Sequence, residues 1–127
     1  MRLLLDTTVL IDALRSRKNR RQLLAELVRV GHTLSISALN VAEIYAGVRA
    51  GEEIVTASFL SAFDCFDINA QTGRMAGELR NKWARKGRTL ALADTVIAAA
   101  AIENHCVLMT DNQKDFPMPE LNLYPLP

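Results

Sequence analysis

Short apolar runs alternate along the chain with longer segments in which hydrophobic residues recur every three or four positions. Apolar runs bounded by polar residues are typical of buried strands, and the periodic segments are typical of amphipathic helices. The pattern predicts strands at residues 2–6, 33–37, 64–68 and 106–110, with a short edge strand around 121–124. It predicts helices at residues 8–16, 17–32, 38–51, 52–63, 69–86 and 95–105. This alternation predicts an α/β fold of three layers, α/β/α, around a short central parallel sheet of four to five strands.

The bulk composition fits a single domain spanning residues 1–127. Half of the residues are hydrophobic, which provides a sizeable core, and no linker or low-complexity tract interrupts the chain. The net charge is +1, from 15 basic and 14 acidic side chains, so a uniformly basic nucleic-acid-binding surface is excluded. No apolar stretch suits a signal peptide or a membrane span. Cys65 and Cys106 lie in apolar stretches outside any zinc-like spacing and are predicted to be reduced, buried thiols of a cytoplasmic protein.

Three acidic residues stand where a charged side chain is unexpected. Asp6 ends the first apolar run, and Glu43 and Asp94 are the only charged residues within 33–48 and 89–102. We expect both of these alanine-rich segments to form buried helices. A lone ionised carboxylate in apolar surroundings is costly unless it is paired or bound to a metal. The three positions therefore suggest acids that meet at one site.

Each of these acids also has a simpler interpretation. Asp94 could serve only as the N-cap of the helix that follows it, and Asp6 could close a turn at the end of a strand. Glu43 lies inside its helix, where it has no capping role, but it could pair with Arg49. Spacing alone leaves these interpretations open.

The predicted topology can bring the acids together. Asp6 lies at the carboxyl end of the first strand, and Asp111 and Asp115 follow the fourth. Glu43 lies about one turn into the helix after the second strand, and Asp94 opens the helix before the fourth. In parallel sheets, ligands bind at the carboxyl ends of the strands. Oxygen ligands without histidine or thiolate suit Mg²⁺ or Mn²⁺ better than zinc.

Four segments resemble, in order and spacing, the motifs of PIN-domain proteins, and most closely those of the VapC toxins of bacterial and archaeal toxin–antitoxin pairs. These segments are LLLDTTVLID, SALNVAEIYAGV, LALADTVIAAAA and LMTDNQKDF. The resemblance runs from Arg2 to about Leu123. It implies a PIN-like fold and an endoribonuclease that depends on Mg²⁺ or Mn²⁺.

The resemblance also implies roles for individual residues. Asp6 and Asp94 match the acids that bind the metal directly, and Glu43 matches the glutamate of the helix motif. The fourth catalytic acid falls within 110–116, where Asp115 is favoured. Asp111 and Asn112 compete for that place or support it. Supporting roles near the metal or the phosphate are also expected for three hydroxyl side chains: Thr7, Thr8 and Thr110. The first motif commonly reads Asp-Thr-Asn or Asp-Thr-Ser, so Thr8 departs from it while keeping a hydroxyl.

The implied reaction is hydrolysis of an RNA phosphodiester by metal-activated water, which leaves 5′-phosphate and 3′-hydroxyl ends. Because an acidic pocket repels the RNA backbone, basic residues must lie nearby. The candidates are Arg15, Arg17, Lys18, Arg20, Arg21, Arg80, Lys82, Arg85, Lys86 and Arg88. The alternative is that they are ordinary solvated helix faces, or that residues 15–21 meet a partner protein.

The resemblance further implies a cognate VapB-type antitoxin in an apolar groove between the early helices, and a homodimer. Two alternatives remain at this stage. One is a PIN-like binding module that has lost catalysis. The other is a phosphohydrolase of the haloacid-dehalogenase type, which requires a second aspartate at the position that Thr8 occupies.

Overall fold

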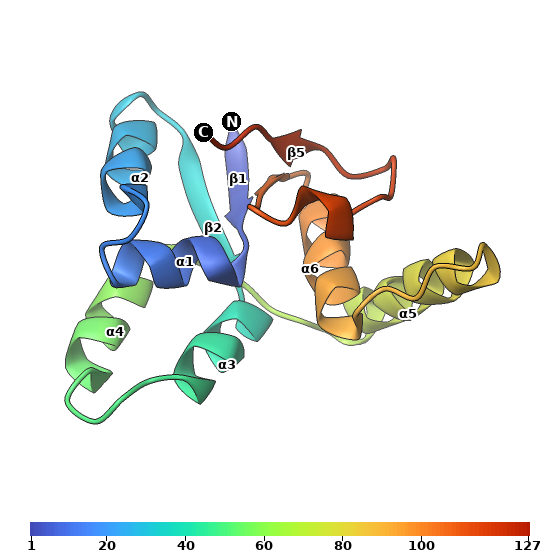
Figure 1. Cartoon of the computed structure of the whole chain (residues 1–127), viewed down its shortest axis with the longest axis horizontal. Coiled ribbons are helices and arrows are strands. Elements are labelled where there is room, and N and C mark those ends of the chain that lie inside the picture. The colour runs from blue at the N-terminus through green and yellow to red at the C-terminus, as the bar shows by residue number, and fades with distance from the viewer.

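A five-stranded parallel sheet, in the order β3-β2-β1-β4-β5, forms the centre of the computed structural model, which describes all residues 1–127 (Figure 1). The strands are β1 (Arg2–Leu5), β2 (Thr33–Ser37), β3 (Asp64–Phe66), β4 (Val107–Met109) and β5 (Leu123–Tyr124). The helices are α1 (Thr7–Leu14), α2 (Arg20–Arg29), α3 (Ala38–Ala46), α4 (Glu53–Leu60), α5 (Ala70–Arg85) and α6 (Leu92–Glu103), with a 3₁₀ turn at Gln113–Asp115. The predicted α/β/α fold with four to five parallel strands is confirmed.

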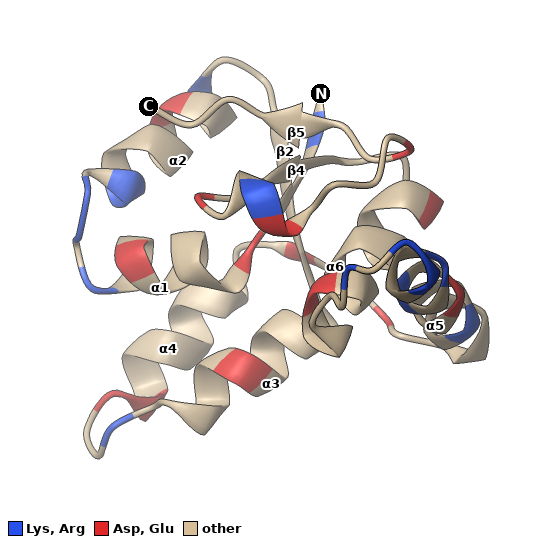
Figure 2. Ribbon diagram, turned by 45° about the vertical axis from the view of Figure 1, so that its right-hand side comes forward, with Lys and Arg blue, Asp and Glu red and all other residues tan.

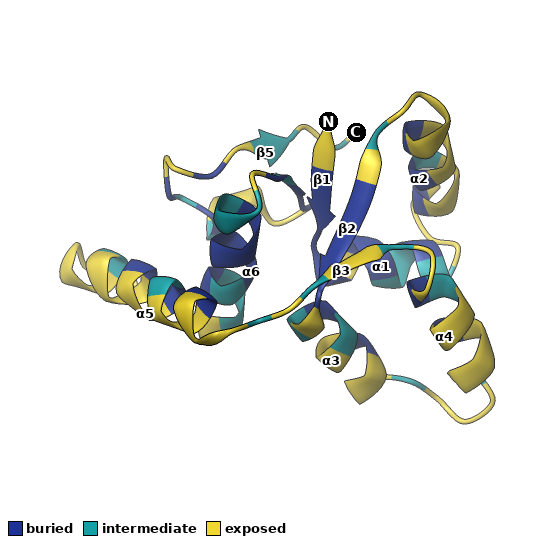
Figure 3. Ribbon diagram, turned by 180° about the vertical axis from the view of Figure 1, so that it is seen from behind, coloured by how far each residue is buried: buried dark blue, intermediate teal, exposed yellow.

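Two apolar cores lie on opposite faces of the sheet, because successive side chains of a strand point to opposite sides. Leu4 packs against α5 and α6 in one core, whereas Leu3 and Leu5 pack against α1, α2 and α4 in the other. All three leucines are fully buried. Figure 3 shows the buried strands running between the two groups of helices. The helix α5 contributes the predicted ridge, with Leu79 in the core and Met75 and Trp83 packed against it.

The order of the strands creates a switch point between β1 and β4. From β1 the chain passes through α1 and α2 to β2 on one side, and it later returns through α5 and α6 to β4 on the other side. The connections therefore leave in opposite directions at the carboxyl ends of β1 and β4. Such a point is where open α/β sheets form a ligand-binding crevice.

Several local predictions are wrong. The helix α3 is not buried all round: only Asn40 and Ile44 are buried, and Glu43 and Tyr45 are exposed. Asp94 is not an N-cap, because α6 begins earlier and its N-cap is Ala91, which provides no side-chain hydrogen bond. Cys65 is exposed because it lies on the edge strand β3, while Cys106 is buried as expected. None of the helices is long and apolar enough to cross a membrane.

Candidate active site

Asp6 is fixed at the switch point by contacts with both neighbouring segments. It is the N-cap of α1, and its Oδ1 accepts a hydrogen bond of 2.9 Å from the backbone N–H of Thr7. Its Oδ2 accepts a hydrogen bond of 2.7 Å from the hydroxyl of Thr110, which follows β4. Its own backbone N–H donates to the carbonyl of Met109 at 2.9 Å. Only 7% of Asp6 is exposed, so this carboxylate is buried and its direction is fixed by the ends of two strands.

Thr7 connects the end of β1 to the segment after β2. Its hydroxyl donates to Oε1 of Glu43 at 2.7 Å and accepts a hydrogen bond of 2.9 Å from Nδ2 of Asn40. Asn40 is fully buried and forms a reciprocal capping box with Ser37 at the start of α3. These hydrogen bonds fix the direction of Glu43, which is 36 residues from Thr7 in the sequence, although Glu43 itself is exposed. Sequence reasoning missed Asn40, yet the spacing Ser37-x-x-Asn40 at a strand end is a recognisable capping signal.

Asp94 lies in the first turn of α6, half-buried beside the other acids. Burial raises the pKa of Asp94 to about 6 from its ordinary value of 3.8, and the negative charges of Asp6, Asp115 and Glu43 add to the effect. The pKa of Asp6 is also raised, mainly by burial and also by Glu43 and Asp111, against the lowering effect of its hydrogen bonds from Thr110 and Thr7. The acids from four separate segments are therefore close enough to oppose one another's ionisation.

The segment after β4 contains three candidates for the fourth acid position, and the structure gives them different surroundings. Asp115 is half-buried in the 3₁₀ turn, and its negative charge contributes to the raised pKa of Asp94. The backbone N–H of Asn112 donates to the hydroxyl of Thr110 at 2.9 Å. Asp111 instead forms ion pairs with Arg20 and Lys18. The geometry therefore favours Asp115, which has no ion pair, for the fourth position.

A family model described as the PIN domain matches residues 3–117 of the chain. The chain belongs to the PIN-domain family. Ribonuclease VapC19 of Mycobacterium tuberculosis strain H37Rv is 35% identical to it over 115 residues, which cover 91% of this chain and 92% of that protein. Ribonuclease VapC2 of Rickettsia felis is 29% identical over 118 residues, covering 89% and 88%. Within the PIN family, the chain therefore groups with the VapC proteins.

The solved structures agree with this placement. VapBC2 from Rickettsia felis, bound to a DNA fragment from its promoter, is similar with a TM-score of 0.83 and 29% identity over 98% of each chain. A toxin–antitoxin complex from Klebsiella pneumoniae is similar with a TM-score of 0.78 and 28% identity over 94% of each chain. The match to the PIN domain over most of the sequence excludes the haloacid-dehalogenase alternative.

The PIN-domain acids fit a divalent metal ion by the chemistry of their donors. Asp6, Glu43, Asp94 and Asp115 offer only carboxylate oxygens, which Mg²⁺ and Mn²⁺ prefer. None of the four forms an ion pair with a lysine or an arginine. As they stand, no three His, Cys, Asp or Glu side chains are grouped closely enough to hold an ion. Carboxylates that repel one another at a buried strand end are what a divalent cation would neutralise.

Figure 2 shows where the basic residues of this PIN domain lie along the ribbon, and their contacts divide them into two groups. Some already serve the fold: Arg15 lies near Glu52 and Gly47, Arg80 donates to Leu90, Arg88 donates to Lys114, and Arg21 donates to Ala13 and Leu14. Arg17, Lys82 and Arg85 are exposed and form no such bond, while Lys86 lies 4.5 Å from the ring centre of Trp83. The prediction that Arg20 is available to RNA is wrong, because its side chain is buried against Asp111.

A polar cavity of about 300 Å³ lies between α1, the loop after it and the segment after β4, and its acidic lining residues are Asp12 and Asp111. Its lining includes Thr8, Arg17, Lys18 and Asn112. Thr8 and Asn112 belong to the segments whose Thr7 and Thr110 contact Glu43 and Asp6, but none of the four candidate acids lines this cavity. A larger cavity, of about 620 Å³, lies elsewhere, between α2 and α4, and its walls are mainly apolar.

Proposed function

We propose that this chain is a metal-dependent endoribonuclease and the toxin component of a VapBC-type toxin–antitoxin pair. One observation carries the proposal: acids from four segments raise one another's pKa values near the switch point without a lysine or arginine partner, and the pKa of Asp94 rises to about 6. A structural role alone does not account for acids placed at such a cost. The VapC relatives, which are named ribonucleases, give the reaction class.

Asp6 and Asp94 would hold Mg²⁺ or Mn²⁺ directly, with Glu43 and Asp115 completing the acidic pocket. When bound at these acids, the cation would supply a water of lowered pKa and charge neutralisation at the phosphodiester, and the proposed hydrolysis leaves 5′-phosphate and 3′-hydroxyl ends. Thr110 and the Thr7 backbone hold the two oxygens of Asp6 in place. The Thr7 hydroxyl holds Glu43 toward the same point. Asn112 supports this arrangement through Thr110.

The RNA would lie across the acids between two groups of cations. On one side, Arg17 and Lys18 line the polar cavity that contains Thr8. On the other side, the α5–α6 connection contributes Arg88, whose guanidinium contacts the backbone of Lys114 next to Asp115. Exposed lysines and arginines in the last turn of α5 and at its C-cap extend this side: Lys82, Arg85 and Lys86. Arg15 and Arg80 would contribute charge while they remain bound to the fold.

The apolar cavity between α2 and α4 is the place where a segment of a VapB-type antitoxin would dock. Its walls include Leu24, Val28, Phe59 and Phe63, and Val28 is 57% exposed. An apolar surface of this kind is typical of a protein-binding groove. We also propose a homodimer, for which exposed apolar side chains such as Tyr45, Ile54 and Leu92 provide contact area.

The test is cleavage of total RNA by the purified chain, free of antitoxin, with Mg²⁺ or Mn²⁺ and with EDTA. Wild type is expected to cut only with the metal, and Asp6→Asn and Asp94→Asn are each expected to lose at least about 100-fold in rate. Asp67→Asn changes an exposed acid that is not among the charges acting on Asp6 and Asp94, and this matched control should cut normally. Cleavage by Asp6→Asn and Asp94→Asn at the wild-type rate would refute the nuclease. A wild type that binds RNA with the metal but never cuts it would favour the binding-module alternative.

A further inference from the structure

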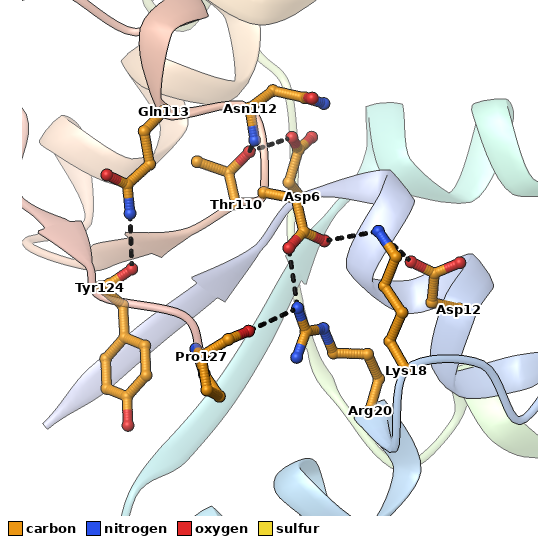
Figure 4. Close-up of polar contacts among 10 residues, drawn as sticks. Asp6, Asp12, Lys18, Arg20, Thr110, Asn112, Gln113, Tyr124 and Pro127 are labelled. Atoms are coloured by element: carbon orange, nitrogen blue, oxygen red, sulfur yellow. Dashed lines mark hydrogen bonds and ion pairs between the residues drawn. The ribbon is translucent and has the colours of Figure 1, made fainter.

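Arg20 is a buried arginine at the first position of α2, far from the acids in sequence. Only 4% of it is exposed, and its Nη2 donates a hydrogen bond of 2.7 Å to Oδ1 of Asp111, the unlabelled carboxylate that Arg20 and Lys18 share in Figure 4. The same nitrogen lies 3.4 Å from the carbonyl oxygen of Pro127, and Nε has no hydrogen-bond partner. The hydrogen bonds of the guanidinium therefore all run through Nη2, and Asp111 is the one side chain with which it pairs.

The loop that leads into Arg20 is strained and converges on the same aspartate. Ser16, Lys18 and Asn19 all have left-handed backbone conformations, with φ of 54°, 54° and 55°, which non-glycine residues adopt at a cost. The ammonium group of Lys18 lies 3.9 Å from Asp111 and 3.7 Å from Asp12. Strained loops persist only where surrounding contacts fix them. Lys18 from this loop and Arg20 just after it thus converge on Asp111.

Asp111 occupies the position between two residues that act on Asp6. On one side, the hydroxyl of Thr110 donates to Oδ2 of Asp6 at 2.7 Å. On the other side, the backbone N–H of Asn112 donates to that same hydroxyl at 2.9 Å, which directs its proton toward Asp6. Any movement of residue 111 moves both contacts.

We propose that Arg20 is a positioning residue for Asp6. By holding Asp111, Arg20 fixes the turn that presents the Thr110 hydroxyl to Asp6. Asp111 then serves as an anchor and not as a ligand of the cation. The inference rests on the proposed function, since it concerns the geometry in which Asp6 would bind the metal. Partners in this position, one step removed from a ligand, set its orientation.

The test measures Mn²⁺ binding by calorimetry and, on the metal-free protein, hydrogen exchange of the Asn112 amide by NMR. Arg20→Gln and Asp111→Asn are expected to weaken Mn²⁺ binding roughly 10- to 100-fold and to speed Asn112 exchange about 10-fold or more. Arg20→Lys, which keeps the charge, is expected to retain part of the Mn²⁺ affinity and part of the protection of the Asn112 amide. Arg29→Gln is the control, because Arg29 is an exposed arginine of the same helix in an ion pair with Glu26.

The direction of the Arg20→Gln effect separates the possible roles. Removing a positive charge near the acids favours Mn²⁺ by Coulomb attraction alone, so weaker binding reports lost geometry. Tighter binding would mean that Arg20 restrains Asp111 from acting as a ligand, and would overturn the inference. Unchanged binding together with unchanged Asn112 exchange would overturn it as well.

Removing one partner of a buried pair can prevent folding, so a double variant completes the design. Arg20→Met with Asp111→Leu replaces the pair by apolar side chains, which proteins often tolerate. It is expected to fold and to show the same losses as Arg20→Gln, and a double variant that binds Mn²⁺ like wild type would overturn the inference. If wild type itself binds no Mn²⁺, the proposed function fails, while Asn112 exchange in the metal-free variants still decides whether Arg20 fixes the turn.

Discussion

Neutralising Asp94 should stabilise the metal-free protein. In the absence of a cation, the carboxylate of Asp94 is partly desolvated and faces the negative charges of Asp6, Asp115 and Glu43. An asparagine at this position would have nearly the same shape without the charge. The substitution Asp94→Asn therefore removes an unfavourable interaction rather than a favourable one, which is the reverse of the usual effect of a mutation in a folded domain.

The size of the effect follows from the pKa of Asp94, which rises from 3.8 in the unfolded chain to about 6 in the folded protein. At about 1.4 kcal/mol for each pKa unit, this shift is worth at most about 3 kcal/mol, and solvent contact of the half-buried side chain reduces it to about 1.5 kcal/mol. Because folding raises the pKa of Asp94, the Asp94 carboxyl does not lower the free energy of unfolding below pH 3.8. Its contribution to stability is lost as the pH rises through 6. The gain from Asp94→Asn is thus expected at pH 8 and absent near pH 3.8.

Urea unfolding followed by circular dichroism, with EDTA present, measures this difference at pH 4 and pH 8. We expect the free energy of unfolding of Asp94→Asn to exceed that of wild type by about 1.5 kcal/mol at pH 8 and to match it at pH 4. Saturating Mn²⁺ should reverse the order at pH 8, because the ion stabilises a folded protein that binds it. An asparagine variant that is less stable than wild type at both pH values would refute the electrostatic reasoning.

Three further predictions concern neighbouring features. Ala91→Ser adds a capping side chain to α6, which begins without one, and should raise the free energy of unfolding by about 1 kcal/mol in urea titrations. Thr7→Val removes the hydroxyl that joins Glu43 to Asn40, and should lower the RNA cleavage rate about 10-fold or more while Thr7→Ser retains most of it. Arg17→Gln should weaken RNA binding and lower the slope of log affinity against log salt by about 1, whereas Arg74→Gln, on the outer face of α5, should change neither.

The sequence is sufficient for the order of the elements, because each strand is a short apolar run and each helix has its own periodicity. It places Asp6 correctly at the end of β1, where the leucines bury their side chains on alternate faces of the sheet. The pattern cannot show where α6 begins, since Leu92 and Ala93 extend the helix without any polar cap, and so it suggests Asp94 as a capping residue. Arg20 falls among the expected exposed cations because nothing in a basic run marks the one side chain that folds inward.

The sequence identifies Glu43 on an argument that the structure corrects. The alanine-rich helix around it suggests burial, whereas α3 leaves Glu43 exposed and fixes its direction through the hydroxyl of Thr7. What joins these residues is a set of neutral side chains at three strand ends: Thr7 after β1, Asn40 after β2 and Thr110 after β4. Neutral donors of this kind can hold carboxylates in place without cancelling their charge. None of these acids forms an ion pair with a lysine or an arginine, so their negative charges stay uncancelled, as the proposed binding of a cation requires.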